Sequence, residues 1–218
     1  MAEMSDTTDL AGTEQWGEPE IALVETPSGE LTLSINGQQA MQAWERDLMW
    51  ASADILCGYG SNFLEAGLGL GISALRIAGH AGTRRHVVVE RYGRVIELFR
   101  QRHPALPAAL EIVEADLFEH FRTLAPGSLD GIFFDPFMPA ALESRREVWD
   151  EFMPFVLQAL RPGGAFIPFF TTDPVLKWPF FHYFDRIAVT RHQYATYADT
   201  NYTTNAAGTA YVQCFVKA

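Results

Sequence analysis

The stretch FLEAGLGLGIS, residues 63–73, decides the fold of this chain. Apolar residues and an acidic one lead into a turn with glycine at positions 67, 69 and 71, and a helical pattern follows. Glycine in a turn between a strand and a helix lets the backbone approach a ligand and frees N–H groups at the helix start. The stretch therefore predicts the first strand, turn and helix of a ligand-binding α/β sheet.

Strand and helix patterns alternate after this stretch. Apolar runs typical of buried parallel strands lie at residues 63–64, 86–90, 110–113, 131–134 and 165–170. Helical patterns lie between them, at residues 72–78, 92–102, 118–124 and 145–160, and the runs 186–194 and 209–217 predict an antiparallel pair at the sheet edge. This order predicts an α/β fold with a doubly wound, Rossmann-like sheet of seven strands.

The N-terminal region differs from the rest of the chain. Residues 31–37 alternate and end in the turn dipeptide Asn36-Gly37, which predicts a short strand. Residues 38–56 show an apolar stripe at helical spacing that includes Trp44 and Leu48. We therefore predict an N-terminal helical extension or lid over residues 1–37 and the sheet domain over residues 38–218.

Composition limits the kinds of partner. The 218 residues include 16 Lys and Arg, which are scattered, and 27 Asp and Glu, for a net charge of −11. Binding to nucleic acid needs clustered cations, and a membrane span needs about 20 apolar residues in a row, so we expect neither partner. The polar N-terminus predicts a cytoplasmic protein. The two isolated cysteines and six histidines show no metal-ligand spacing, so we expect no metal, a small-molecule substrate, and a monomer or homodimer.

The acidic residue Glu90 extends the pattern of the glycine turn. It ends the predicted second strand about 20 residues after the turn, where a carboxylate can accept both hydroxyls of a ribose. This pattern alone leaves three alternatives open, which are a nucleoside cofactor, a dinucleotide and a tight turn without a ligand. The dinucleotide stays open because Gly69, Gly71 and Ala74 also satisfy the dinucleotide fingerprint.

Three downstream signals favour one alternative. Glu114-Ala115-Asp116 follows the third strand, Asp130 and Asp135-Pro136-Phe137 belong to the fourth, and Pro162-Gly163-Gly164 precedes the fifth. This ordered set resembles the S-adenosylmethionine-dependent methyltransferases of class I, and a hydride-transfer enzyme has no need of it. We therefore expect S-adenosyl-L-methionine as cofactor and S-adenosyl-L-homocysteine as product.

Two carboxylates are candidates for the chemistry. Phe134-Asp135-Pro136-Phe137 resembles the D/N-P-P-Y/F turn of amino-group methyltransferases, although Asp before proline is also a common turn signal. Helical spacing places Met41, Glu45 and Met49 in one row, which leaves a functional and an unremarkable role for Glu45 equally open.

The residues also resemble the guanidinoacetate N-methyltransferase family from about Trp16 to Thr172. MQAWERDLM, residues 41–49, is similar to the family's M-x-x-W-E-x-x-x-M helix. Residues 63–73, 129–135 and 160–164 are similar to its cofactor loop, fourth-strand motif and fifth-strand turn.

The resemblance implies a role for each matched residue. Glu45 and Asp135 would be the catalytic pair that holds a guanidinium, with Asp135 as proton acceptor and Glu45 as clamp, and the reverse assignment stays open. Backbone N–H groups of Thr171 and Thr172 would bind a substrate carboxylate, and Trp16 would belong to a lid. The residues expected around the cofactor are Trp16, Met41, Met49, Glu65, Gly67, Leu68, Gly69, Leu70, Gly71, Ile72, Ser73, Glu90, Arg91, Tyr92, Asp116, Leu117, Phe118, Glu119 and Asp135.

The similarity fades after Thr172, where Asp173-Pro174 and Phe180-Phe181 differ from the family. This favours an arginine-like or guanidinoacetate-like acceptor other than guanidinoacetate itself, in specialised metabolism. The alternatives are a methyltransferase for another small-molecule oxygen, nitrogen or carbon, a nucleic-acid amino-methyltransferase, a protein arginine methyltransferase and a noncatalytic nucleoside-binding module.

Overall fold

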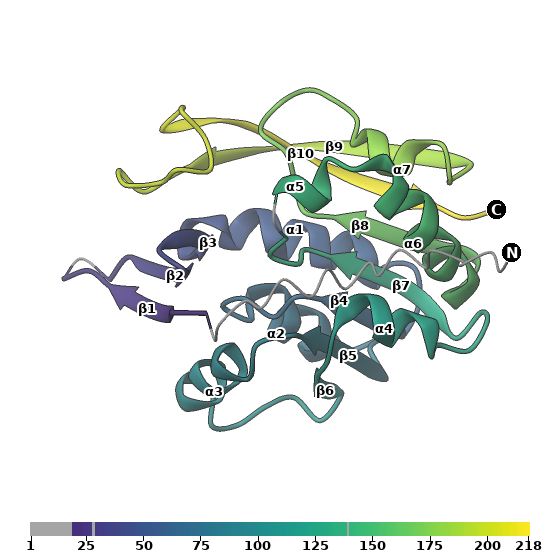
Figure 1. Cartoon of the computed structure of the whole chain (residues 1–218), viewed down its shortest axis with the longest axis horizontal. Helices are drawn as coiled ribbons and strands as arrows, with labels where there is room; N and C mark the ends of the chain where they lie inside the picture. The colour runs from purple at the N-terminus through teal and green to yellow at the C-terminus, as the bar shows by residue number, and fades with distance from the viewer. Residues whose placement is uncertain (1–18, 28, 139) are drawn as a thin grey trace, which may run out of the picture.

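A central sheet with helices on both faces forms the core of the molecule (Figure 1). The computed structural model describes residues 19–27, 29–138 and 140–218. The strands are β1 (Ile21–Glu25), β2 (Leu31–Ile35), β3 (Gln38–Gln42), β4 (Asn62–Ala66), β5 (Arg85–Glu90), β6 (Leu110–Glu114), β7 (Leu129–Phe134), β8 (Leu160–Pro168), β9 (Arg186–Ala195) and β10 (Ala207–Val216). The helices are the 3₁₀ helix η1 (Ala43–Glu45), α1 (Arg46–Cys57), α2 (Ile72–Gly79), α3 (Gly93–Arg102), α4 (Leu117–Arg122), α5 (Ala140–Glu143), α6 (Arg146–Ala159) and α7 (Trp178–Phe181).

The strand order confirms the predicted fold. The seven-stranded sheet has the order β6-β5-β4-β7-β8-β10-β9. Strands β4 to β8 run parallel, and β10 pairs antiparallel with both β8 and β9. The order reverses between β4 and β7, so the crevice at their carboxyl ends is the expected ligand site of a doubly wound sheet.

Successive side chains along each central strand pack into two different hydrophobic clusters, one on each face of the sheet. In β7, Ile132 and Phe134 pack in the cluster that contains Phe152 of α6, whereas Phe133 packs with Leu56 of α1 on the opposite face. Successive residues of a strand point to opposite faces, and both faces here are covered by helices. This explains why the central strands are continuous apolar runs.

The N-terminal region corrects two predictions. Residues 38–42 form strand β3 rather than the start of a helix, and β1, β2 and β3 make a three-stranded antiparallel sheet, so the described part of the extension is not helical. The reason is the turn: Asn36 and Gly37 have φ values of 50° and 72°, the left-handed pair that a tight hairpin requires. Figure 1 shows this small sheet at one end of the molecule, beside α3.

The predicted domain boundary between residues 37 and 38 lies in this hairpin turn. Because Met41 lies on β3 and Met49 on α1, the predicted helical row of Met41, Glu45 and Met49 does not form. None of the described helices is long and apolar enough to cross a membrane.

Candidate active site

The glycine turn after β4 brings three parts of the chain together. Gly67 and Gly69 have φ values of 89° and 51°, which other residues rarely adopt. A Cβ atom at Gly67 would lie 2.5 Å from the carbonyl oxygen of Asp135, and one at Gly69 would lie 2.7 Å from Cε of Met41. The backbone N–H of Leu70 also donates to Sδ of Met41 at 3.3 Å. The turn therefore packs against Met41 of β3 on one side and against Asp135, at the end of β7, on the other.

Gly67→Ala should destabilise this turn. A left-handed conformation costs a side chain about 1–2 kcal/mol, and the clash with Asp135 adds to it. We expect the melting temperature to fall by roughly 5 °C or more and any ligand that contacts the turn to bind at least about tenfold more weakly. Gly79→Ala is the control, because no atom lies within 4 Å of its Cβ position. Equal melting temperatures and affinities in the two variants would contradict this interpretation of the turn.

Glu90 is held at the edge of this turn. Its two carboxylate oxygens accept hydrogen bonds from the backbone N–H groups of Leu68 and Tyr92, each at 2.9 Å. Burial raises the pKa of Glu90, and the hydrogen bonds oppose this rise. Each oxygen keeps a further lone pair, so the carboxylate can still accept the hydroxyls of a ribose.

Asp116 lies at the same edge of the sheet. Its side chain caps α4 by accepting the N–H of Glu119 at 3.1 Å, and Nη1 of Arg91 lies 3.8 Å from it.

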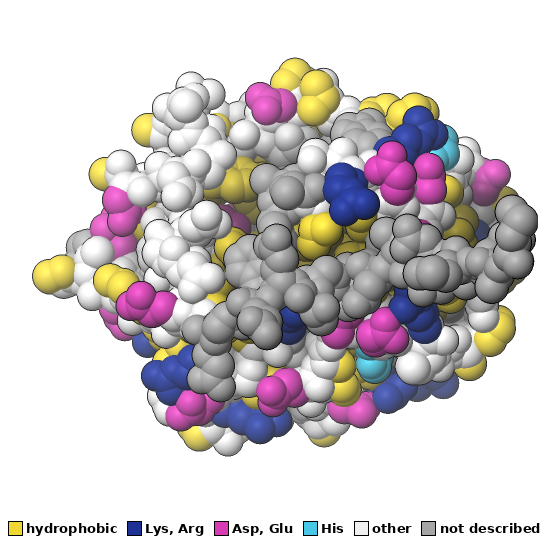
Figure 2. All heavy atoms as spheres, viewed as in Figure 1, with side chains coloured by type: hydrophobic (Ala, Val, Ile, Leu, Met, Phe, Trp, Pro, Cys, Tyr) yellow, Lys and Arg dark blue, Asp and Glu magenta, His cyan; other side chains and the backbone are white. Residues whose placement is uncertain are grey.

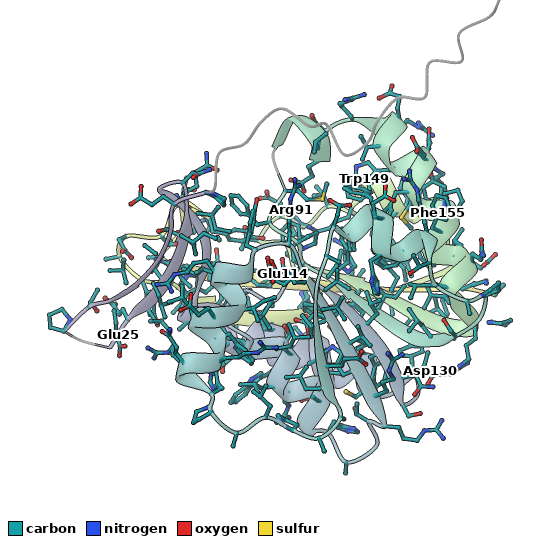
Figure 3. The ribbon with its side chains drawn as sticks, turned by 60° about the horizontal axis from the view of Figure 1, so that its bottom comes forward. Glu25, Arg91, Glu114, Asp130, Trp149 and Phe155 are labelled. Atoms are coloured by element: carbon teal, nitrogen blue, oxygen red, sulfur yellow. The ribbon has the colours of Figure 1, made fainter. Side chains whose placement is uncertain are left out.

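Figure 3 shows Arg91 and Glu114 far from Asp130. Asp130 begins β7 at the opposite edge, where it accepts the N–H groups of residues 61 and 62 and pairs with Arg161, so it joins strands and has no place in the site.

Several residues predicted around the cofactor have their side chains inside the protein. The buried Glu65 carboxylate accepts the hydroxyl of Ser73 and lies 3.1 Å from Nε2 of His86. Met49 has no exposed surface, and the ring of Phe118 packs at 4.9 Å from that of Phe152. In this structure these side chains contact other protein groups, and their place around a cofactor stays a prediction. Trp16 lies outside the described residues.

Glu45 and Asp135 line one cavity of about 580 Å³. The described residues around it come from β3, η1, the end of β7, α5, α6, the end of β8 with the segment after it, α7, and the segment before β10. Aromatic side chains make up much of its wall: Phe134, Phe137, Trp149, Phe169, Phe180 and Tyr202. The structure therefore places the two predicted catalytic carboxylates in a single aromatic-lined site.

The W-E motif positions Glu45 through local contacts. One carboxylate oxygen of Glu45 accepts the N–H of Gln42 at 2.7 Å, and the Gln42 side chain accepts the indole N–H of Trp44 at 2.9 Å. The Trp44 ring packs against Tyr202 and Phe170, with centroids 6.1 and 6.0 Å away. Burial raises the pKa of Glu45 to about 8, and the charge of Asp135 adds to the rise.

Asp135 is positioned by the sheet itself. Its backbone N–H continues the β7 ladder by donating to the carbonyl of Ala66 at 3.0 Å. Burial raises the pKa of Asp135 to about 7, the charge of Lys177 opposes this rise, and that of Glu65 adds to it. Two desolvated carboxyl groups in one cavity favour a cationic ligand, because a cation relieves the cost of ionising both.

The substrate-carboxylate prediction is wrong for Thr171. Its backbone N–H donates to the carbonyl of Tyr211 at 3.1 Å, in a bridge between the end of β8 and β10, so it is not available to a ligand. Thr171 lines the cavity nonetheless. The role of Thr172 stays a prediction.

Sequence reasoning missed Tyr202 and Lys177. The Tyr202 hydroxyl donates to the carbonyl of Phe170 at 2.9 Å, and burial strongly raises its pKa. Lys177 lines the cavity, and burial lowers its pKa to about 7. The available signal was that Lys177 is one of two lysines in the chain and lies within the apolar run 174–181. No cluster suited to a metal ion occurs among the residues that the structure describes.

Known structures share the fold of this chain. The spermidine synthase of Thermotoga maritima superposes with a TM-score of 0.70 at 19% identity, over 92% of this chain and 70% of that one. A spermidine synthase in complex with the transition-state analogue AdoDATO gives 0.69 at 18%, over 92% and 71%. An O-methyltransferase-like protein of Klebsiella pneumoniae gives 0.53 at 15%, over 79% and 80%.

These structural likenesses show the fold. The sequence of residues 11–172 matches the model of the family described as guanidinoacetate N-methyltransferase. The match includes Glu45, the glycine turn, Glu90 and Asp135. The chain therefore belongs to the guanidinoacetate N-methyltransferase family, with the fold of a methyltransferase enzyme.

Proposed function

We propose that the protein is an S-adenosylmethionine-dependent N-methyltransferase whose acceptor is a small guanidino compound. The observation that carries this proposal is the meeting of Glu45 and Asp135 in one cavity, although they lie far apart in the sequence. That cavity borders the glycine turn, because the carbonyl of Asp135 packs against Gly67.

The residues at the carboxyl edge of the sheet fit S-adenosylmethionine. Gly67 lets the turn pack directly against the end of β7, where a Cβ atom would clash, and the Glu90 carboxylate beside the turn is fixed by two backbone hydrogen bonds. When bound, this cofactor supplies an electrophilic methyl group on a sulfonium. Glu90 would bind its ribose and the turn its polar end.

Glu45 and Asp135 would bind and orient the acceptor. A guanidinium is planar and protonated at neutral pH, with a pKa above about 12, so its nitrogens are poor nucleophiles. Two carboxylates can form charge-assisted hydrogen bonds with it and favour charge on the nitrogens that do not react. Asp135 would accept the proton that the reacting nitrogen loses as it takes the methyl group, with S-adenosyl-L-homocysteine as the leaving group, and alignment of the acceptor nitrogen would lower the barrier.

Acceptor affinity should rise with pH. In the ligand-free protein the pKa values of Glu45 and Asp135 are about 8 and about 7, and both groups must be ionised to bind a guanidinium. For a guanidine that carries no carboxylate, and so does not depend on the charge of Lys177 (pKa about 7), we therefore expect the Kd to fall at least about tenfold between about pH 6 and about pH 9. Calorimetry in buffers of different ionisation enthalpy should also detect proton release on binding. A flat pH profile without proton release would contradict this prediction.

A screen of acceptors tests the proposed function. The protein is incubated with S-adenosylmethionine and a panel of guanidino acids, amines, phenols and peptidyl arginines, and products are identified by mass. A mass increase of one methyl group on a free guanidine supports the proposal. Turnover of a phenol or amine but of no guanidine would refute it. Turnover of peptidyl arginine alone would point to a protein substrate.

Surface charge argues against a nucleic-acid acceptor. Figure 2 shows that basic and acidic side chains of the described residues are interspersed on one face of the molecule. Together with the net charge of −11, this mixture offers little attraction to the phosphates of a nucleic acid. We therefore infer that the acceptor is not a nucleic acid.

A further inference from the structure

The charged residues of the acceptor cavity form two groups. Of the described residues around it, four are charged: Glu45, Asp135, Glu143 and Lys177. The proposed function uses Glu45 and Asp135 for the guanidinium. Lys177 and Glu143 therefore face the same space without an assigned role.

Lys177 is held in place from two directions. Its ammonium lies over the Phe169 ring, 2.9 Å from the centroid. Its backbone N–H donates to Oε1 of Gln213 at 2.9 Å, and Nε2 of Gln213 donates to the carbonyl of Val175 at 2.8 Å. Gln213 is itself only 2% exposed, on β10. A buried side chain of the sheet thus fixes the segment that carries this cation.

Glu143 is the acidic neighbour of Lys177. It ends α5, and its backbone carbonyl accepts the indole N–H of Trp149 at 2.8 Å, which anchors the residue at the rim of the cavity. Desolvation lowers the pKa of Lys177, whereas the charges of Glu143 and Asp135 raise it. An anion that binds to Lys177 would restore the charge that burial disfavours.

We propose that the acceptor is a free guanidino α-amino acid of the arginine class, whose α-carboxylate binds Lys177 and whose α-ammonium binds Glu143. This inference rests on the proposed function, because it places the guanidinium between Glu45 and Asp135. It also replaces the Thr171 amide, which is already hydrogen-bonded, as the receiver of the carboxylate.

The pairing of charges in the cavity supports this class over related ones. Three carboxylates and one ammonium line the fully ionised cavity. A guanidino α-amino acid carries a guanidinium, an ammonium and a carboxylate, so each of its charges has an opposite partner in the cavity. Guanidinoacetate would leave Glu143 without a partner, and agmatine, which has no carboxylate, would leave Lys177 without one.

Three matched ligands test the contact with Lys177 and the contact with Glu143 independently. L-Arginine is compared with agmatine, which lacks the carboxylate, and with 5-guanidinopentanoate, which lacks the ammonium. We expect arginine to be favoured over agmatine by about 10- to 100-fold and over 5-guanidinopentanoate, which lacks only the contact with the exposed Glu143, by about two- to five-fold, both in kcat/KM and in calorimetric Kd. Because the calorimetric comparison needs no methyl transfer, it tests binding independently of turnover.

Variants assign each preference to one residue. In Lys177→Met the preference for arginine over agmatine should fall to near one, whereas Lys177→Arg should keep part of it. In Glu143→Gln the preference for arginine over 5-guanidinopentanoate should disappear. Glu147→Gln, an exposed acid of α6 outside the cavity, is the matched control and should keep both preferences. Ratios between ligands are the readout, because Lys177 also affects the pKa of Asp135.

The outcomes distinguish this inference from the proposed function. If no guanidine is bound or methylated, the proposed function fails. If guanidines are methylated but arginine is not preferred, or if the variants keep the wild-type ratios, only the amino-acid assignment is overturned. Loss of both ratios in Glu147→Gln would likewise overturn it, because that side chain does not line the cavity.

Discussion

Asp135→Asn is expected to lower kcat for methylation of the guanidino acceptor by about three orders of magnitude. The amide has almost the same shape and cannot accept a proton at neutral pH. The backbone hydrogen bond from residue 135 to Ala66 does not involve the side chain, so the turn should be preserved. Steady-state kinetics should show a larger change in kcat than in KM.

Asp47→Asn provides the control for this variant. It makes the same chemical change at an exposed position in the first turn of α1. If Asp135→Asn retains more than about a tenth of the wild-type kcat, the side chain is not the proton acceptor. Glu45 would then be the first candidate for that role.

Glu45→Gln should act mainly on acceptor binding. The glutamine can still accept the Gln42 N–H, but it removes one of the two charges that hold the guanidinium. We expect kcat/KM for a guanidine to fall by about 100-fold or more, whereas transfer to a phenol, which needs no such clamp, would change little. Comparable losses on both kinds of acceptor would contradict the clamp.

A measurement of stability distinguishes this loss of activity in Glu45→Gln from unfolding of the variant. The pKa of Glu45 is about 8 in the folded protein, above its ordinary value of 4.5. A carboxyl with a raised pKa binds its proton more tightly in the folded state, so its stabilising effect is full below about pH 4.5 and is lost as the pH rises through about 8. The glutamine variant avoids this loss, and at about pH 9 its melting temperature should equal or exceed that of the wild type.

The sheet could be predicted because its signals are local. Continuous apolar runs, glycine turns and Pro162-Gly163-Gly164 mark strands and connections within a few residues, and chain order then gives the parallel topology. In the N-terminal sheet the strand at residues 31–35 was predicted, but β3 was missed because residues 38–42 fit both a helical and an alternating pattern. Only the hairpin turn at Asn36-Gly37 distinguishes them, and its partner strand β1 gives a weak signal.

The site residues that lie at the ends of strands could be predicted from the sequence. Glu90 and Asp135 close β5 and β7, and a parallel sheet brings such ends to one edge. Glu45 came from the family resemblance. Lys177 and Tyr202 could not be inferred, because they enter the cavity from connections whose paths depend on distant contacts, such as that of Gln213 with residues 175 and 177.

The attachment of residues 175–177 to Gln213 has a consequence for how this protein can evolve. The family match ends at residue 172, so the groups proposed to act on the reacting nitrogen precede the segment that carries Lys177. A short connection pinned to β10 by one buried amide can be exchanged without disturbing the strand ends that carry Glu90 and Asp135. Under the roles proposed above, the contact with the acceptor's carboxylate can therefore change while the groups that act on the reacting nitrogen are kept.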